Sequence, residues 1–271
     1  MPNPGNVCAP INIHGIGRSG TTLLQNILAA TGHVQVCNET AGMVLCCYRG
    51  GEVALLSDDS ESTLGHAELP AAIVRAALCT TMPSRKPHWC QKLGGIPNQV
   101  VWNMTTTADH NYASLPYPFP YEWYWRAVHD AFPSSKDVLI LRDYRDVIIS
   151  RYRHSRWPAT DIASDVAVYF NLLAHPMAEF DHVILFQDLV AQPKATVAGM
   201  LTALDVESEQ DALRAMEYYA VPSDSRDLAE ARAVGFTWQG SHNDLVTDEI
   251  KRLVAPAVSR LERRLGVQMV R

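Results

Sequence analysis

The amino-acid sequence predicts an α/β fold in which helices cover both faces of a central parallel sheet. Short apolar runs alternate along the chain with longer segments of helical periodicity, which is typical of strand-helix units. Two of these runs lead directly into turns rich in glycine or arginine, as expected where ligands bind beyond the carboxyl ends of parallel strands. The 271 residues, 47% of them hydrophobic, show no compositional break, so we expect one domain over residues 1–271.

The first half of the chain supplies three of the expected strands. Residues 9–17, APINIHGIG, read as a strand that enters a glycine turn, and residues 21–32, TTLLQNILAATG, as a helix with Gly32 at its C-terminal end. VQVCNE at 34–39 is a short strand, residues 68–82 carry a helical pattern, and HWCQKLGG at 88–95 is a strand that ends in a loop.

The second half repeats this alternation. Residues 116–132 are a connection rich in proline and aromatic residues that becomes a helix near Glu122. DVLILRD at 137–143 is a buried strand, followed by a helix from about Arg145 with Asp143 as its N-cap. Residues 182–204 form another strand-to-helix unit, and the C-terminal third is mostly helical apart from residues 233–244.

Composition excludes several classes of function. A formal charge of −6 gives no general attraction to nucleic acid or to an anionic membrane, so an anion must be held by a local cluster. The chain has neither the pattern of a signal peptide nor an apolar segment of the ~20 residues that span a bilayer, and we expect a cytoplasmic protein. The six cysteines lack C-x-x-C or metal-ligand spacing, which favours free thiols in a reducing compartment.

The glycine turn resembles a phosphate loop without its lysine. In the pattern G-x-x-x-x-G-K-[ST], Gly15 and Gly20 keep the spacing, but Thr21 replaces the lysine and the cation is Arg18. Backbone N–H groups in such a turn, with the helix N-terminus behind them, still favour an anion. The loop therefore suits a phosphate group that has no metal-bound γ-phosphate.

A second candidate anion site follows the strand at 137–143. Arg142 ends this strand, and Ser150 lies about two turns into the next helix, so both side chains can converge on one phosphate. Between 142 and 156, two aspartates accompany five arginines: Arg142, Arg145, Arg151, Arg153 and Arg156. Apart from Arg142, these arginines also fit an ordinary solvated helix face.

GRSGTTLL and LILRDYRDVIISRYRHS together resemble the 5′-phosphosulfate and 3′-phosphate motifs of sulfotransferases that use 3′-phosphoadenosine-5′-phosphosulfate (PAPS), in the spelling of the bacterial and tyrosylprotein branch. The resemblance implies a P-loop-like three-layer fold, PAPS as co-substrate, adenosine 3′,5′-bisphosphate (PAP) as product and no metal. It implies that Arg142, Ser150 and, near the C-terminal loop around Trp238, Arg232 or Arg226 bind the 3′-phosphate. The 5′ end is assigned by the same resemblance to Gly17, Arg18, Ser19, Gly20, Thr21 and Thr22.

The resemblance also implies the catalytic groups. HVQVCNET places Glu39 where relatives carry the general base for the acceptor hydroxyl, with His14 and His33 as alternatives. An ordinary glutamate, with a pKa of about 4.3, is a weak base toward an alcohol, so desolvation or concerted proton transfer is required. KPHWCQKLGG places Lys92, with Arg18, where a cation stabilises the leaving oxygen, although the family usually continues Lys-Thr-Pro. Phe186-Gln187 likewise stands where the family has tyrosine-glutamate.

The acceptor must be recognised by segments that match no family motif, residues 43–85 and 102–135. Residues 111–130 carry four tyrosines, two tryptophans and a phenylalanine near several acidic residues. They would suit a small, neutral or cationic acceptor with a hydroxyl or amine, or they are aromatic anchors that fix a long loop to the core. The sequence leaves open whether the protein is a monomer or a homodimer.

Two other functions remain open on the sequence. A P-loop kinase or nucleotide hydrolase would use Asp143 as a metal ligand, although the lysine is missing at position 21. A non-catalytic module that binds an adenosine phosphate would keep Arg18, Arg142 and Ser150 but would have no use for Glu39.

Overall fold

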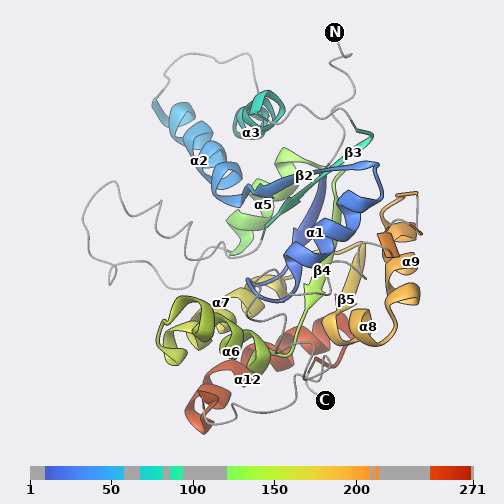
Figure 1. Ribbon diagram of the computed structural model, residues 1–271. Helices are drawn as coiled ribbons and strands as arrows, with labels where there is room; N and C mark the ends of the chain where they lie inside the picture. Colours follow the sequence, from blue (N-terminus) through green and yellow to red (C-terminus); the bar gives the residue numbers. More distant parts are fainter. Residues whose placement is uncertain are drawn as a thin grey trace.

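Five parallel strands form the centre of the molecule (Figure 1). The structure, a computed structural model, describes residues 10–57, 68–81, 86–93, 121–207, 210, 212–213 and 245–269. The strand order is β2-β3-β1-β4-β5, and every neighbouring pair is parallel. The strands are β1 (Pro10–His14), β2 (Val34–Glu39), β3 (His88–Lys92), β4 (Lys136–Leu141) and β5 (His182–Leu185). The predicted α/β class, with its central parallel sheet, is confirmed.

Helices cover both faces of this sheet. They are α1 (Thr21–Ala30), α2 (Ala41–Ser57), α3 (Glu68–Thr81), α5 (Tyr121–Ala131), α6 (Tyr144–Ser155), α7 (Ala159–Leu173), α8 (Phe186–Ala191), α9 (Pro193–Ala203) and α12 (Asp248–Leu265). Apolar residues of α1, α8 and α9 form one core with the strands. Apolar residues of α2, α3, α5, α6, α7 and α12 form the other. These two cores give the three layers.

The central strand β1 faces both cores, which explains its uninterrupted burial. Because side chains alternate along a strand, Ile11 and Ile13 enter the core under α1. Asn12 and His14 point to the opposite face, where the His14 ring lies 5.2 Å from the Trp125 ring. The sheet thus carries buried polar side chains on the face that α5 and α7 cover.

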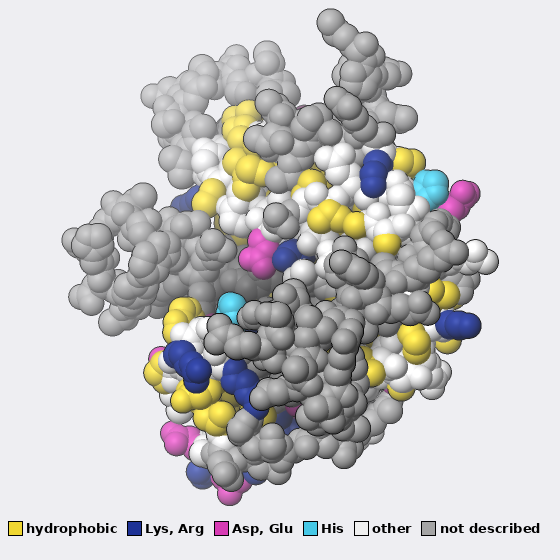
Figure 2. Space-filling model, in the orientation of Figure 1, with side chains coloured by type: hydrophobic (Ala, Val, Ile, Leu, Met, Phe, Trp, Pro, Cys, Tyr) yellow, Lys and Arg dark blue, Asp and Glu magenta, His cyan; other side chains and the backbone are white. Residues whose placement is uncertain are grey.

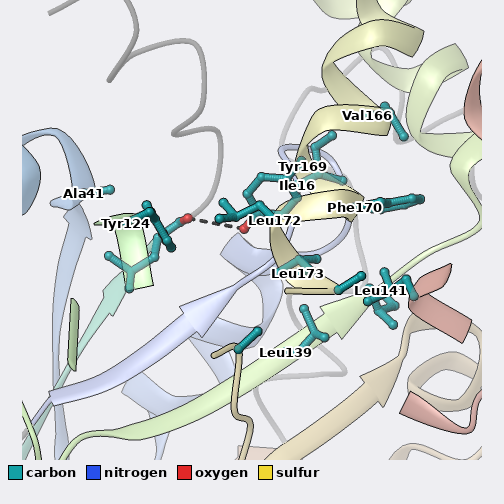
Figure 3. Packing of buried hydrophobic residues seen from close by; sticks show 14 of the residues in the cluster. Ile16, Ala41, Tyr124, Leu139, Leu141, Val166, Tyr169, Phe170, Leu172 and Leu173 are labelled. Atoms are coloured by element: carbon teal, nitrogen blue, oxygen red, sulfur yellow. Dashed lines mark hydrogen bonds between the residues drawn. The ribbon is translucent and has the colours of Figure 1, made fainter. Parts of the chain in front are cut away.

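Of the helices that form the core on that face, α7 contributes the most residues. Figure 3 shows Phe170 and Leu173 of α7 packing toward Leu139 and Leu141 of β4, deep in the molecule. Each of these side chains is at most 1% exposed. This packing fixes α7, and with it Tyr169, near the carboxyl end of β1, where the glycine turn begins.

Most predicted elements begin and end within two residues of their expected positions. Gly32 follows the last turn of α1 with a positive φ of 78°, and Asp143 caps α6 by accepting a hydrogen bond from the Arg145 backbone N–H. The unit over 182–204 differs, because its helical part is two helices, α8 and α9. Pro193 begins the second one, since proline fits the first helical position and cannot continue a preceding helix.

Two further features concern the chemistry of the chain as a whole. Among the described residues, no helix combines the length and the apolarity needed to cross a bilayer. Cys37, Cys46, Cys47 and Cys90 form no disulfide bond, while Cys8 and the side chain of Cys79 lie outside the described residues.

Candidate active site

The glycine turn of residues 15–20, here called the phosphate loop, joins β1 to α1. Ser19 donates its backbone N–H to the Ile16 carbonyl at 3.0 Å, which closes the turn. Arg18 and Gly20 both have positive φ values, 77° and 107°. Such a turn points successive backbone N–H groups at one space, and the first turn of α1 contains no acidic residue to neutralise them. The loop therefore presents a positive concave surface.

The two anion sites predicted from the sequence, the glycine turn and the pair of Arg142 and Ser150, meet at this surface. Arg18 Nε donates to Ser150 Oγ at 3.1 Å, and Arg142 Nη1 lies 3.4 Å from the Arg18 carbonyl oxygen. Figure 1 shows the start of α1 and the start of α6 at the same end of the parallel strands, beyond their carboxyl ends. A cavity of about 210 Å³, here called the anion pocket, lies between them and is lined by Arg18, Gly20, Thr21, Thr22, Arg142 and Ser150.

The anion pocket holds two guanidinium groups and one nearby carboxylate. Burial lowers the pKa of Arg142 from its ordinary value, and the charge of Arg18 adds to this effect, while Asp146 at 3.5 Å opposes it. Arginine stays protonated even so, and the pocket keeps excess positive charge. The Arg142 guanidinium also lies 4.5 Å from the centre of the Phe186 ring, which holds it in place.

Two other arginines of α6 are paired with carboxylates of the protein. Arg145 pairs with Asp143, and Arg151 donates to Asp165 at 2.9 Å. Figure 2 shows basic side chains gathered at the lower left of the face, where Figure 1 places α6. Arg145 and Arg151 therefore already have carboxylate partners within the protein, and Arg151 joins α6 to α7.

Lys92 and Glu39 lie beside the phosphate loop. Lys92 ends β3, its side chain is 11% exposed, and its Nζ lies 3.3 Å from Thr22 Oγ1 and 3.6 Å from Glu39 Oε1. The Glu39 side chain is 57% exposed at the end of β2. Lys92 thus connects the first turn of α1, directly after the phosphate loop, to the accessible carboxylate of Glu39. A cation that stabilises charge beside a base would have this position.

Buried side chains that no sequence motif indicated support the phosphate loop from the protein interior. Tyr169 Oη accepts the Gly15 backbone N–H at 3.0 Å and donates to the Leu93 carbonyl at 3.3 Å. Phe186 packs so closely on Gly20 that an added Cβ would lie 2.8 Å from its ring. Ser19 Oγ is buried and has no hydrogen-bond partner within the described ranges. Ser19 is fully buried and is not among the residues that line the anion pocket, so its side chain belongs to the interior of the loop.

Some predicted residues are not brought to this site. His14 is fully buried and its Nε2 lies 2.5 Å from Asp137 Oδ1, which keeps it from any acceptor. His33 precedes β2, whereas Glu39 is the last residue of β2, so the two residues lie at opposite ends of this strand. Tyr124 and Trp125 of the aromatic segment are core residues, so this part anchors the segment. Residues 102–120, which include the first half of that segment, and Arg226, Arg232 and Trp238 lie outside the described residues.

A larger cavity of about 830 Å³ lies elsewhere, against the ends of α3 and α5. Its lining includes five acidic side chains and one arginine: Glu68, Asp130, Asp137, Glu179, Asp181 and Arg75. Carboxylates repel phosphate, so the smaller anion pocket is the better nucleotide site despite its size. Within the described residues, no group of three or more His, Cys, Asp or Glu side chains could hold a metal ion.

Comparison with known proteins agrees with this geometry. A search of curated proteins finds no matching relative. The family model described as "Sulfotransferase family" matches residues 10–210, which include the phosphate loop, Glu39, Lys92, Arg142 and Ser150. Because this match covers well over half of the 271 residues, the chain belongs to the sulfotransferase family.

Proposed function

We propose that the protein transfers a sulfuryl group from PAPS to the hydroxyl or amine of a small-molecule acceptor. The observation that carries this proposal is the contact between Arg18 and Ser150 at 3.1 Å. It joins the glycine turn after β1 to the helix after β4 across 132 residues of sequence. Two anion-binding elements that share one pocket suit a ligand with a phosphate at each end, such as PAP.

The phosphate loop would hold the 5′ end of the nucleotide. The backbone N–H groups of residues 17, 18 and 20–22, at the start of α1, attract its negative charge, by about 0.3–1 kcal/mol and up to ~2 where partly buried. The Thr21 and Thr22 side chains, which line the anion pocket, would be further donors. Thr22 reaches the same space through its contact with Lys92.

Arg142 and Ser150 would hold the 3′-phosphate. Arg142 is largely buried, with 13% of its side chain exposed, and the Phe186 ring holds its guanidinium, so little conformational freedom remains to be lost on binding. A hydrogen bond from a charged donor of this kind contributes about 1.5–3 kcal/mol. The Ser150 hydroxyl would exchange its present contact with Arg18 for the phosphate.

Glu39 would take the proton of the acceptor hydroxyl or amine while the acceptor oxygen or nitrogen forms its bond to sulfur. The bond between sulfur and the bridging phosphate oxygen breaks, and the electron pair stays on that oxygen. Lys92 and Arg18 then stabilise the negative charge at the place where it develops, which is the most effective position for fixed cations. PAPS supplies only the sulfuryl group; binding, orientation and proton removal belong to these side chains.

The open side of Glu39 is where the acceptor would enter. With 57% of its side chain exposed, the carboxylate can be reached and covered by a small acceptor. The carboxylate also favours a neutral or cationic acceptor over an anionic one. We therefore propose that the PAPS-dependent activity acts on small molecules. We expect the protein to act in the cytoplasm.

A glutamine substitution at Glu39 tests this function. Glu39→Gln should reduce the turnover of PAPS with a panel of phenols, alcohols and amines at least 100-fold, since general bases contribute about 10²–10⁴-fold. The Kd for PAP, measured by calorimetry, should change less than threefold. Glu122→Gln is the matched control, because Glu122 is a similarly exposed glutamate, 64% exposed, in an ion pair with Arg126. Equal loss of turnover and PAP affinity in Glu39→Gln would overturn the assignment of the base.

A further inference from the structure

The strand β2 contains an irregularity immediately before Glu39. Its register with β3 runs Val34 with His88 and Val36 with Cys90, but then Glu39 with Lys92. Residues 37 and 38 of β2 therefore face Gln91 alone, which is the arrangement of a β-bulge. Without the extra residue, position 38 and not 39 would stand opposite Lys92. The bulge is what brings the Glu39 carboxylate to Lys92.

Two buried glutamines hold this bulge from opposite faces of the sheet. Gln25 of α1, 2% exposed, donates its Nε2 to the carbonyl oxygen of Cys37 at 2.5 Å. On the other face, the Thr40 hydroxyl donates to Gln91 Oε1. Each hydrogen bond acts on a residue next to or near Glu39, so the chain is fixed on both sides of the bulge.

The orientation of Gln91 is itself determined by a chain of buried side chains. Gln91 Nε2 donates to Asn12 Oδ1 at 2.7 Å, and Asn12 Nδ2 donates to Asp137 Oδ1 at 3.1 Å. An ionised carboxylate only accepts hydrogen bonds, so Asn12 must turn its amide N–H₂ toward Asp137 and its oxygen toward Gln91. Gln91 must then present its own oxygen to Thr40. The carboxylate of Asp137 on β4 thus determines the orientation of the Asn12 and Gln91 amides, and through them which atom of Gln91 faces Thr40.

Burial makes alternatives to this arrangement costly. Asn12 and Gln91 are 0% exposed and Thr40 is 2% exposed, so no water can replace a lost partner without opening the core. The hydrogen bonds cross the sheet in the register that aligns β2, β3, β1 and β4. Glu39 and Lys92 are the last residues of β2 and β3, and the phosphate loop and Arg142 directly follow β1 and β4.

We propose that Thr40, Gln91 and Gln25 are positioning residues, which hold the bulge of β2 and so set the Glu39 carboxylate opposite Lys92. This inference rests on the proposed role of Glu39 as the base. The three side chains touch neither nucleotide nor acceptor; they act through the backbone that carries Glu39.

Thr40→Val tests the proposal, because valine keeps the shape and removes the hydroxyl. We expect turnover of PAPS, with the acceptor that the panel identifies, to fall about 10- to 100-fold, since a displacement of about 1 Å at a catalytic group costs on the order of 10²-fold. The Kd for PAP should stay within threefold. Thr40→Ser restores the donor and should recover most of the turnover. Amide exchange in residues 36–40, measured without ligand, should be faster in Thr40→Val than in Thr40→Ser.

Thr31→Val is the matched control for the loss of a buried hydroxyl. Thr31 is 3% exposed and donates to the Leu28 carbonyl at 2.7 Å, far along α1 from the phosphate loop. It should lower stability to a similar degree and leave turnover within twofold. Equal loss of turnover in both valine variants would overturn the positioning role.

A double variant separates this proposal from the proposed function. If Thr40 acts through Glu39, Thr40→Val should have almost no further effect on the residual turnover of Glu39→Gln. A full, additive loss in the double variant overturns the positioning role while leaving the base intact. Unchanged turnover in Glu39→Gln alone would instead overturn the role of the base, whatever Thr40→Val does.

Discussion

Arg142 offers the sharpest test of how the nucleotide is held. In the anion pocket its guanidinium lies 4.5 Å from the centre of the Phe186 ring and 3.4 Å from the Arg18 carbonyl oxygen. Arg142→Ala removes one charged donor to the 3′-phosphate, which contributes about 1.5–3 kcal/mol. Since 1.4 kcal/mol is tenfold in affinity, we expect the Kd for PAP to rise about 10- to 150-fold.

The assay is calorimetry with PAP and with adenosine 5′-phosphate, which lacks the 3′-phosphate. The loss should be large for PAP and less than threefold for adenosine 5′-phosphate. Arg145→Ala is the control, because Arg145 lies on the same helix but is paired with Asp143; its affinity for PAP should stay within threefold. If Arg142→Ala weakened both nucleotides equally, Arg142 would hold the loop and not the 3′-phosphate.

Three further predictions concern the loop, the pocket and the polar core. Ser150→Ala should raise the Kd for PAP about 2- to 10-fold by calorimetry, the loss of one neutral hydrogen bond of about 0.5–1.5 kcal/mol; unchanged affinity would remove Ser150 from the site. Gly20→Ala should lower both Tm and PAP affinity, because its φ of 107° and the Phe186 ring at 2.8 Å leave no room for a Cβ; a wild-type Tm would contradict this. Burial acts to raise the pKa of Asp137, but hydrogen bonds from His14 and other neighbours outweigh it and lower the pKa below 3.8. Its contribution to stability should therefore be complete above pH 3.8 and be lost as the pH falls through the lower folded value, so urea unfolding of Asp137→Asn should depend less on pH there than that of the wild type.

Most strands and helices with strong periodicity were predicted from the sequence, while the helices α2 and α7 were not predicted. α1 and β4 follow from clear apolar patterns next to a glycine and a capping aspartate. α2 contains the pair Gly50-Gly51 and has apolar residues around much of its circumference, so it shows no helical stripe. α7 begins directly after Pro158, and its buried residues, Ile162, Val166, Tyr169 and Leu173 among them, recur at helical spacing, so this helix carried a periodic signal that the prediction did not use.

The groups that carry charge in the site were predictable, but their support was not. Arg18, Arg142 and Ser150 stand in recognisable motifs, and the structure brings them together. Gln25 and Gln91 are single amides within apolar segments, and nothing local marks them as partners of a bulge. Their significance depends on the register of β2 with β3, which arises from tertiary pairing and not from local sequence.

The most direct test of the account is a thermal-shift comparison of PAP, ATP with Mg²⁺, and NAD. A ligand at a hundredfold excess over its Kd stabilises the folded state by about 2.7 kcal/mol, enough to rank the three. We predict that PAP raises Tm most, and that Arg18→Ala and Arg142→Ala each abolish most of this rise because one nucleotide bridges both residues. A larger rise with ATP and Mg²⁺, or a PAP effect that survives both substitutions, would contradict the account.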